Sequence, residues 1–191
     1  MSVILFGYYG CGNLGDEKLL DDTVRLVQQY SGRFIVANGQ YPTPFPSFNR
    51  WNPFLWCIYL IRFRYLIFGG GSLFQSSTSF LSLLYYLFIV IMAYICRCKV
   101  ILLCHGWGPF KYSWHESMAK FILKKANRSW RSPNKVSSEF NDSIFCDLTL
   151  TQSLPKETVK DSSTVAVSIR SIKDAKKVMQ ELSNYFSTIH Y

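Results

Sequence analysis

Short apolar runs alternate with longer amphipathic stretches along most of this chain. Runs at residues 3–6, 34–37, 65–68 and 99–104 have the length and composition of buried strands. The intervening stretches predict helices over residues 16–30, 51–63, 80–96 and 114–126. Strands that alternate with helices indicate a mainly parallel sheet with right-handed crossovers. The predicted fold class is therefore α/β, with a Rossmann-like sheet.

The pattern also suggests a domain division. Residues 1–153 form the predicted Rossmann-like domain, and the polar segment 154–163 is the predicted linker. A strand over 164–169 and a helix over 172–186 follow, so residues 164–191 are expected to be the first β-α unit of a second domain.

Residues 80–96 form a stretch of seventeen residues without a charge. A helix that spans a membrane needs about 20 apolar residues, with about 17 as the lower limit. The stretch lies between a glycine turn and the next strand, where a crossover helix belongs, so a buried helix is favoured. Contact with a membrane surface is the alternative.

The composition of the chain limits the cellular compartments and the kinds of partner that we expect for it. The chain is 49% hydrophobic and 17% aromatic, enough for a buried core, and its formal net charge is +9. That charge suits anionic partners or a solvated basic surface. The six cysteines have no zinc-site spacing and are interpreted as buried, reduced thiols, so no metal is expected. With no signal peptide after Met1, a cytoplasmic location is expected.

Glycine turns follow three of the predicted strands. The first contains Gly10, Gly12 and Gly15 in the spacing G-x-G-x-x-G. The acidic residue that a nicotinamide or flavin site needs about 20 residues later is replaced by Ala37-Asn38-Gly39, so no cofactor is expected. A tight turn and a substrate-binding turn both remain open.

The second turn, Gly69-Gly70-Gly71-Ser72, favours ligand contact, because three glycines let backbone N–H groups approach an anion or a sugar. The third turn follows His105, whose role is either structural or catalytic. Aromatic and basic residues interleave over 51–65, but their apolar density favours a core over a nucleic-acid interface. No nucleic-acid partner is expected.

These turns together resemble the polysaccharide pyruvyl transferase family, in its branch that acts on cell-wall polymers. The resemblance rests on Tyr8-Tyr9-Gly10-Cys11-Gly12-Asn13-Leu14-Gly15-Asp16-Glu17, Gly69-Gly70-Gly71-Ser72-Leu73-Phe74-Gln75, Gly106-Trp107-Gly108-Pro109 and Val167-Ser168-Ile169-Arg170. It implies a glycosyltransferase-B-like fold and transfer of enolpyruvyl from phosphoenolpyruvate to two hydroxyls of a glycan, often lipid-linked, at the inner membrane face.

The resemblance also implies a set of substrate-binding residues. Arg170, at the end of a predicted strand, would hold the phosphate or carboxylate of the donor, or else be a surface arginine. The full set is Tyr9, Gly10, Asn13, Gly15, Asp16, Gly70, Gly71, Ser72, Gln75, Gly106, Gly108 and Arg170.

The sequence departs from the family pattern at three places. Gln75-Ser76 occupies the place of the family's Gln-Asp pair, and Arg131-Ser132 occupies the place of its Arg-Asp pair. The family's late Arg-Leu-His motif has no counterpart in this sequence. We therefore expect a truncated homologue that a second chain completes or that is inactive. The alternatives are a non-catalytic glycan- or membrane-binding remnant and a fragment of a nucleotide-sugar glycosyltransferase.

Overall fold

The structure is a computed structural model that describes residues 2–30, 32–144, 164–166 and 188–190. Internal contacts divide the chain into two units, Met1–Gln152 and Ser153–Tyr191. In the second unit, β8 (Thr164–Ala166) and β9 (Thr188–His190) form a parallel pair. The predicted linker 154–163 and helix 172–186 lie outside the described residues, as does Arg170.

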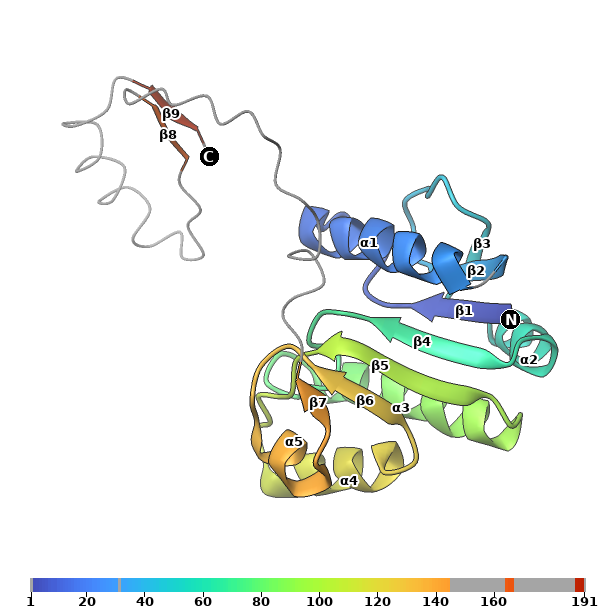
Figure 1. Ribbon diagram of the computed structural model, residues 1–191, viewed down its shortest axis with the longest axis vertical. Helices are drawn as coiled ribbons and strands as arrows, with labels where there is room; N and C mark the ends of the chain where they lie inside the picture. The colour runs from blue at the N-terminus through green and yellow to red at the C-terminus, as the bar shows by residue number, and fades with distance from the viewer. Residues whose placement is uncertain (1, 31, 145–163, 167–187, 191) are drawn as a thin grey trace. The chain divides into compact units, whose positions relative to one another are not determined.

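The described residues of the first unit form one sheet and five helices (Figure 1). The strands are β1 (Ser2–Phe6), β2 (Arg33–Asn38), β3 (Ser47–Asn49), β4 (Tyr65–Gly69), β5 (Lys99–His105), β6 (Asn127–Trp130) and β7 (Ser143–Ile144). The helices are α1 (Leu14–Tyr30), α2 (Pro53–Arg62), α3 (Phe80–Ile95), α4 (Ser113–Leu123) and α5 (Lys135–Phe140).

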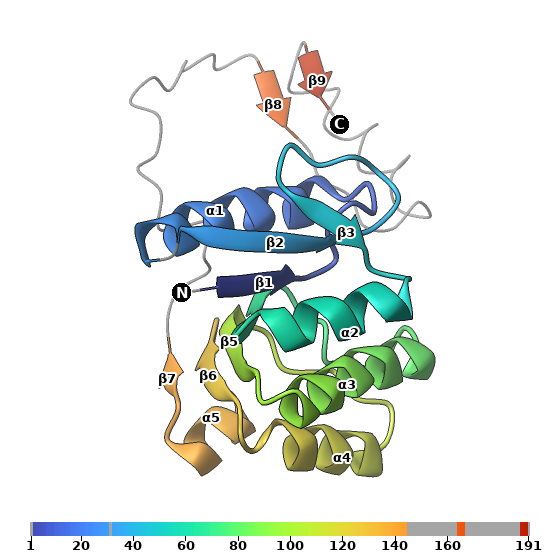
Figure 2. The ribbon, with the colours of Figure 1, turned by 90° about the vertical axis from the view of Figure 1, so that its right-hand side faces the viewer.

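The sheet is parallel throughout and has the order β3-β2-β1-β4-β5-β6-β7. This arrangement confirms the predicted α/β class and the Rossmann-like sheet. Strands β2 and β3 follow β1 toward one edge of the sheet, whereas β4, β5, β6 and β7 lie on the other side of β1 in that order. Helix α1 covers one face, whereas α2, α3 and α4 cover the other (Figures 1 and 2). The strand order therefore reverses between β1 and β4, where α/β sheets bind ligands.

Local signals start the helices on the second face. Asn52 caps α2 by accepting from the N–H groups of Phe54 and Leu55, and Pro53 fits the first turn because its missing N–H is not needed there. Ser79 caps α3 by accepting from the N–H of Ser82. These caps fix where each crossover ends and its helix begins.

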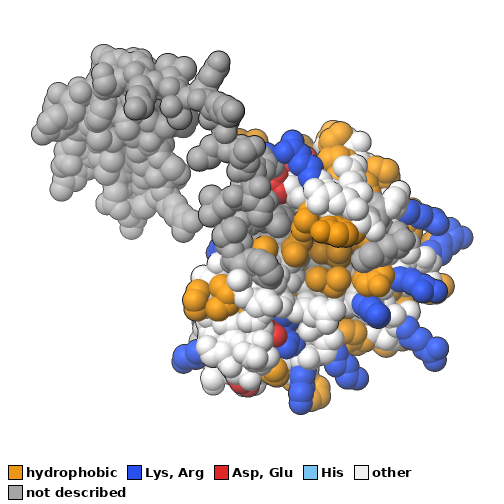
Figure 3. All heavy atoms as spheres, viewed as in Figure 1, with side chains coloured by type: hydrophobic (Ala, Val, Ile, Leu, Met, Phe, Trp, Pro, Cys, Tyr) orange, Lys and Arg blue, Asp and Glu red, His pale blue; other side chains and the backbone are white. Residues whose placement is uncertain are grey.

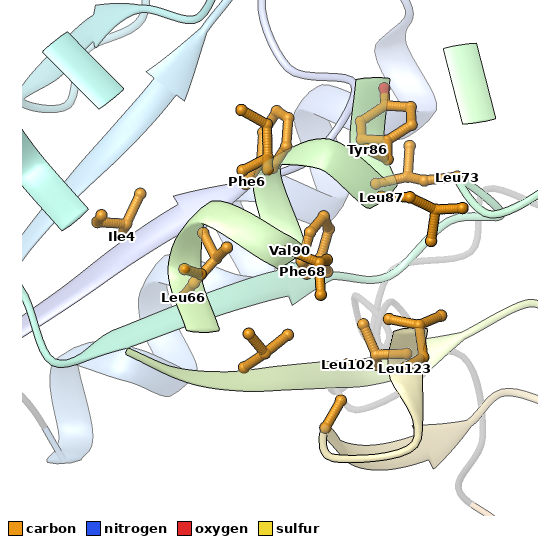
Figure 4. Close-up of a cluster of buried hydrophobic side chains, with 14 of the residues drawn as sticks. Ile4, Phe6, Leu66, Phe68, Leu73, Tyr86, Leu87, Val90, Leu102 and Leu123 are labelled. Carbon is orange, nitrogen blue, oxygen red and sulfur yellow. The ribbon is translucent and has the colours of Figure 1, made fainter. Parts of the chain in front are cut away.

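The main core lies between α3 and the sheet (Figure 4). On the inner side of α3, Leu83, Tyr86 and Val90 are buried, together with Phe6 of β1 and Phe68 of β4. The prediction of a buried helix is confirmed for this side only, because the outer side is exposed and apolar. Among the described residues, no helix combines the length and apolar character needed to cross a membrane.

The face that carries α1 is less completely covered. An apolar groove of about 190 Å³ runs beside α1 and is lined by Val3, Leu26, Tyr30, Ile101 and Leu103, among others. In the space-filling view, apolar side chains gather at the middle of this face (Figure 3). Ile101 and Leu103 of β5 are therefore only half-buried on this face.

Two segments differ from the sequence-based prediction. Helix α4 ends at Leu123 rather than at residue 126, and β6 and α5 occupy a stretch in which no helix or strand is predicted. Strand β6 tolerates a charge because Arg128 forms an ion pair with Asp142 at 2.7 Å and donates to the carbonyl of Leu123. A polar strand of this kind carries no apolar run for periodicity to detect.

The cysteines also differ in part from the prediction. Those described are free thiols, and Cys98 and Cys104 are buried as predicted. Cys11 and Cys96 are half-buried, and Cys57 is exposed on α2. The expectation of burial is therefore wrong for Cys57, which lies on the outer side of its helix.

We predict that Phe68→Ala lowers the free energy of unfolding by about 3–5 kcal/mol, because it removes a ring that is 0% exposed and leaves a cavity. The matched control is Phe121→Ala, since Phe121 is 80% exposed and its change should stay within about 0.5 kcal/mol. Urea unfolding followed by circular dichroism gives both values. Equal losses in the two variants would contradict the placement of the core.

Candidate functional site

Three turns come together at the carboxyl ends of β1, β4 and β5. We call them the turn cluster and define it as residues 7–13, 69–72 and 105–109. The cluster flanks the point where the strand order reverses, and the N-terminus of α1 follows directly from its first turn. Free N–H groups at a helix N-terminus favour acceptor groups of a ligand.

The first turn is fixed to α1 and to the loop after β2. The N–H of Gly10 donates to Oε1 of Glu17 at 2.7 Å, and the N–H of Gly15 donates to Oδ1 of Asn13 at 3.0 Å. The carbonyl of Gly10 accepts from the N–H groups of Gln40 and Tyr41. Gly10 has a φ of +65° and is buried against Asn38, so a side chain there would overlap its neighbour.

Tyr9 lies beneath the turn cluster rather than on its surface. Its side chain is 1% exposed, and its hydroxyl donates to the carbonyl of Gly69 at 2.9 Å. Burial raises the pKa of this hydroxyl well above its ordinary value, so it stays protonated and keeps donating. Tyr9 was expected to bind substrate, and in this structure it holds the second turn against the first.

Backbone hydrogen bonds join the second turn to the third. The N–H of Gly70 donates to the carbonyl of Leu103, and the N–H of Gly106 donates to the carbonyl of Gly71 at 2.7 Å. Gly106 has no room for a side chain, because a Cβ there would collide with Oγ of Ser72. A glycine is therefore required at position 106, because the second and third turns approach each other closely there.

Ser76 is a buried residue that the sequence analysis treated only as a departure from the family pattern. Its hydroxyl accepts from the N–H of Lys111 at 2.9 Å and lies 2.7 Å from Nδ1 of His115. Its own N–H donates to the carbonyl of Pro109. Ser76 thereby locks the segment after the second turn to the segment after the third.

His105 is buried and does not face solvent. Its Nδ1 lies 2.8 Å from the carbonyl of Gly106, and no hydrogen-bond partner for Nε2 is found in the described part of the chain. An irregularity in the β5–β6 register between Leu102 and His105, with a φ of +48° at Cys104, turns this ring inward. Burial lowers its pKa to about 4. Of the structural and the catalytic role that the sequence leaves open for His105, this buried position favours the structural role.

Arg50 is the buried charge that sequence reasoning missed. Its side chain is 1% exposed and donates to the carbonyl of Gly7 at 2.7 Å and to the hydroxyl of Tyr86 at 2.9 Å. The guanidinium also lies 4.9 Å from the ring centre of Phe6 and 5.1 Å from that of Trp51. An arginine held by aromatic faces and a carbonyl stabilises the start of the first turn.

Four polar side chains in the turn cluster or directly after its first two turns are partly or fully exposed. They are Asn13, Asp16, Ser72 and Gln75. Oδ1 of Asp16 points toward Gly71, where it lies 3.7 Å from the position that a Cβ would occupy. Ser72 accepts a 3.5 Å hydrogen bond from Arg131, which places a cation at the same edge.

The electrostatics of Asp16 distinguish it from an ordinary surface carboxylate. Partial burial and, to a lesser extent, the neighbouring Glu17 raise its pKa. A raised pKa makes the ionised carboxylate a stronger acceptor of a hydroxyl proton. Together with Asn13 and Ser72, it suits a ligand that offers hydroxyl groups.

The predicted site residues therefore fall into three groups. Gly10, Gly106 and Tyr9 are buried supports, whereas Asn13, Gly15, Asp16, Gly71, Ser72 and Gln75 reach the surface of the cluster. Gly70 and Gly108 are buried and adopt positive φ, and Arg170 lies outside the described residues. In the described ranges, no group of three His, Cys, Asp or Glu side chains is arranged to hold a metal ion.

Comparison with known families agrees with this geometry. The sequence model of the polysaccharide pyruvyl transferase family matches residues 13–188, so the match begins in the first turn and includes the other two. A comparison with curated proteins finds no match.

We predict that Tyr9→Phe lowers the free energy of unfolding by about 1–3 kcal/mol, because it leaves the buried carbonyl of Gly69 without its partner. Tyr8→Phe is the control, since Tyr8 is 46% exposed. Chemical denaturation of the two variants measures the difference. Similar stabilities would mean that the hydroxyl of Tyr9 does not join the turns.

We also predict that His105 makes the fold sensitive to acid. In the unfolded chain the imidazole takes a proton below its ordinary pKa of 6.5, whereas the folded protein resists protonation until about pH 4. The stabilisation that the neutral imidazole provides is therefore complete above pH 6.5 and is lost as the pH falls to 4. This loss lowers the free energy of unfolding by about 3 kcal/mol.

Denaturation of the natural chain and of His105→Asn at pH 7 and pH 4 tests this sensitivity. The asparagine retains a donor for the carbonyl of Gly106 but has no proton to gain. The drop in stability between the two pH values should be smaller in His105→Asn by about 3 kcal/mol. An unchanged drop would assign the acid sensitivity to other groups.

Proposed function

The chain belongs to the polysaccharide pyruvyl transferase family, and we propose that it transfers enolpyruvyl from phosphoenolpyruvate to a sugar of a cell-wall or surface polysaccharide. The product is a pyruvate ketal. The observation that carries this proposal is the family match over residues 13–188, which begins at the last residue of the first turn and includes the second and third turns.

The proposed reaction consumes two sugar hydroxyls and one donor. The oxygens of the two hydroxyls form bonds to C2 of the donor, and the bond from C2 to the phosphate oxygen breaks. The methylene carbon gains a proton and becomes the methyl group of the ketal, the second hydroxyl proton is released, and inorganic phosphate leaves. No net oxidation or reduction occurs, so the reaction requires no redox cofactor.

In this proposal the turn cluster binds the acceptor sugar. Asn13 and Ser72 offer hydrogen bonds to sugar hydroxyls, and Asp16 lies beside the backbone of Gly71 where such a hydroxyl would approach. The raised pKa of Asp16 suits a general base that takes the proton of an attacking hydroxyl. The space beside Gly71 leaves room for the sugar ring, since the nearest atom to a Cβ there would be Oδ1 of Asp16 at 3.7 Å.

The donor brings a phosphate and a carboxylate and therefore requires cations. We assign this role to Arg170, the residue that the family resemblance indicates, because guanidinium groups bind both anions in bidentate geometry. The net charge of +9 would attract such a donor from solution.

The test measures binding and turnover separately on the full chain. In calorimetry, phosphoenolpyruvate should bind saturably, and Arg170→Ala should abolish the heat while the exposed Arg25→Ala does not. Absence of binding to the natural chain would contradict a donor site. Binding of a nucleoside diphosphate instead would favour the glycosyltransferase alternative.

We predict that Asp16→Asn lowers acceptor-dependent phosphate release by about 10²–10⁴-fold and leaves phosphoenolpyruvate binding unchanged. The matched control is Asp21→Asn, five residues along α1 and on another side of that helix. A continuous phosphate assay with a panel of glycans measures both variants. Full activity in Asp16→Asn would remove this carboxylate from the proposed mechanism.

A further inference from the structure

The outer side of the α2–α3 layer is apolar and exposed. Along α3 the outward residues follow the three-and-four spacing of one helix side, and along α2 the same spacing recurs. They are Leu81, Leu84, Phe88, Ile91 and Ile95 on α3 and Phe54, Ile58 and Ile61 on α2, and we call them the outer apolar face. Phe54, Leu81 and Ile61 are each at least 74% exposed. An apolar face of this extent marks an interaction surface.

The two helices form one surface rather than two separate stripes. Helix α2 packs against α3, and α3 packs against α4 (Figure 2). Between α2 and α3 the surface is hollowed by a groove of about 160 Å³, with Trp51, Trp56, Phe88 and Met92 in its walls. The groove offers room for part of a hydrocarbon chain.

The charged residues at the ends of α2 and α3 are all basic. The sequence contains no Asp or Glu between Asp22 and Glu116, and α3 contains no charged residue. Exposed cations lie at the C-terminal ends of the helices instead, with Arg62 at the end of α2, Arg64 just after it, and Arg97 and Lys99 after α3. In the described part of the chain, none of these four forms an ion pair. Because both helices run antiparallel to the strands, these cations lie along one edge of the face.

Aromatic residues with polar atoms mark the opposite ends of the helices. Trp51, just before α2, is 59% exposed, and Trp114, at the start of α4, is 54% exposed. Tryptophan favours the boundary between lipid and water, because its ring is apolar and its N–H needs a polar partner.

From these observations we propose that the outer apolar face binds the surface of a bilayer that contains anionic lipids. The apolar side chains enter the boundary between head groups and acyl chains, and the basic edge contacts the head groups. A second copy of the chain fits less well, because two such faces would bring cations together without a carboxylate to pair with them. This proposal does not depend on the pyruvyl transfer reaction.

Flotation of the full chain with lipid vesicles tests the proposal. We expect binding to vesicles of phosphatidylglycerol and phosphatidylcholine, weakened by salt, and little binding to phosphatidylcholine alone. Phe88→Ser with Ile91→Ser should weaken binding by at least about tenfold, because two exposed apolar side chains no longer enter the lipid. Arg62→Gln with Arg97→Gln should weaken it about fivefold for each charge.

Two controls separate this surface from general stickiness and from misfolding. Tyr30→Ser and Arg25→Gln alter exposed residues of α1, on the other face of the sheet, and should bind vesicles like the natural chain. Thermal unfolding should match in all variants, since every altered side chain is exposed. The tryptophan emission should shift to shorter wavelength on vesicle binding, because Trp51 and Trp114 enter a less polar medium.

Three results would overturn the proposal. One is absence of binding to anionic vesicles, and another is equal loss of binding in the face variants and the α1 controls. The third is a dimer in sedimentation that Phe88→Ser with Ile91→Ser dissociates while vesicle binding persists, which would assign the face to a second copy of the chain.

Discussion

The fold of the first unit depends on the buried guanidinium of Arg50. Its two terminal nitrogens bind the carbonyl that ends β1 and a tyrosine of α3, while its own carbonyl accepts from Trp56 of α2 and Tyr85 of α3. A charge removed from water is costly unless hydrogen bonds and aromatic faces surround it. The position of β1, and with it the first glycine turn, is thus fixed to the same helix layer that carries the outer apolar face.

Within the turn cluster, the residues that hold the backbone in place differ from those that are accessible to a ligand. Buried groups such as Tyr9, Ser76 and His105 fix the backbone of the turns from below. Asp16 and Ser72 are left free to meet a ligand, apart from the weak bond from Arg131. Rigid support beneath a few accessible polar groups is what precise substrate positioning requires.

The sequence predicts those features that local patterns encode. Strands β1 and β4 are buried on both faces and β5 is buried on one and half-buried on the other, so all three read as unbroken apolar runs, and each glycine turn is recognised because it follows such a run. Strand β6 escapes detection because its Arg128 is neutralised by Asp142, whose contact exists only in the folded chain. The buried role of Arg50 and the supporting role of Tyr9 could not be predicted for the same reason, since their hydrogen-bond partners come from elements that are distant in the sequence.

The strand order also determines when the ligand edge can form. Strand β1 is synthesised before both of its neighbours in the sheet, since Val3 pairs with Phe34 on one side and with Tyr65 on the other. Until Tyr65 has emerged, β1 has an open edge that exposes its apolar run to other chains. Contacts this distant in sequence also slow folding. A nascent chain of this protein therefore passes through an aggregation-prone interval that ends only when β4 has paired with β1.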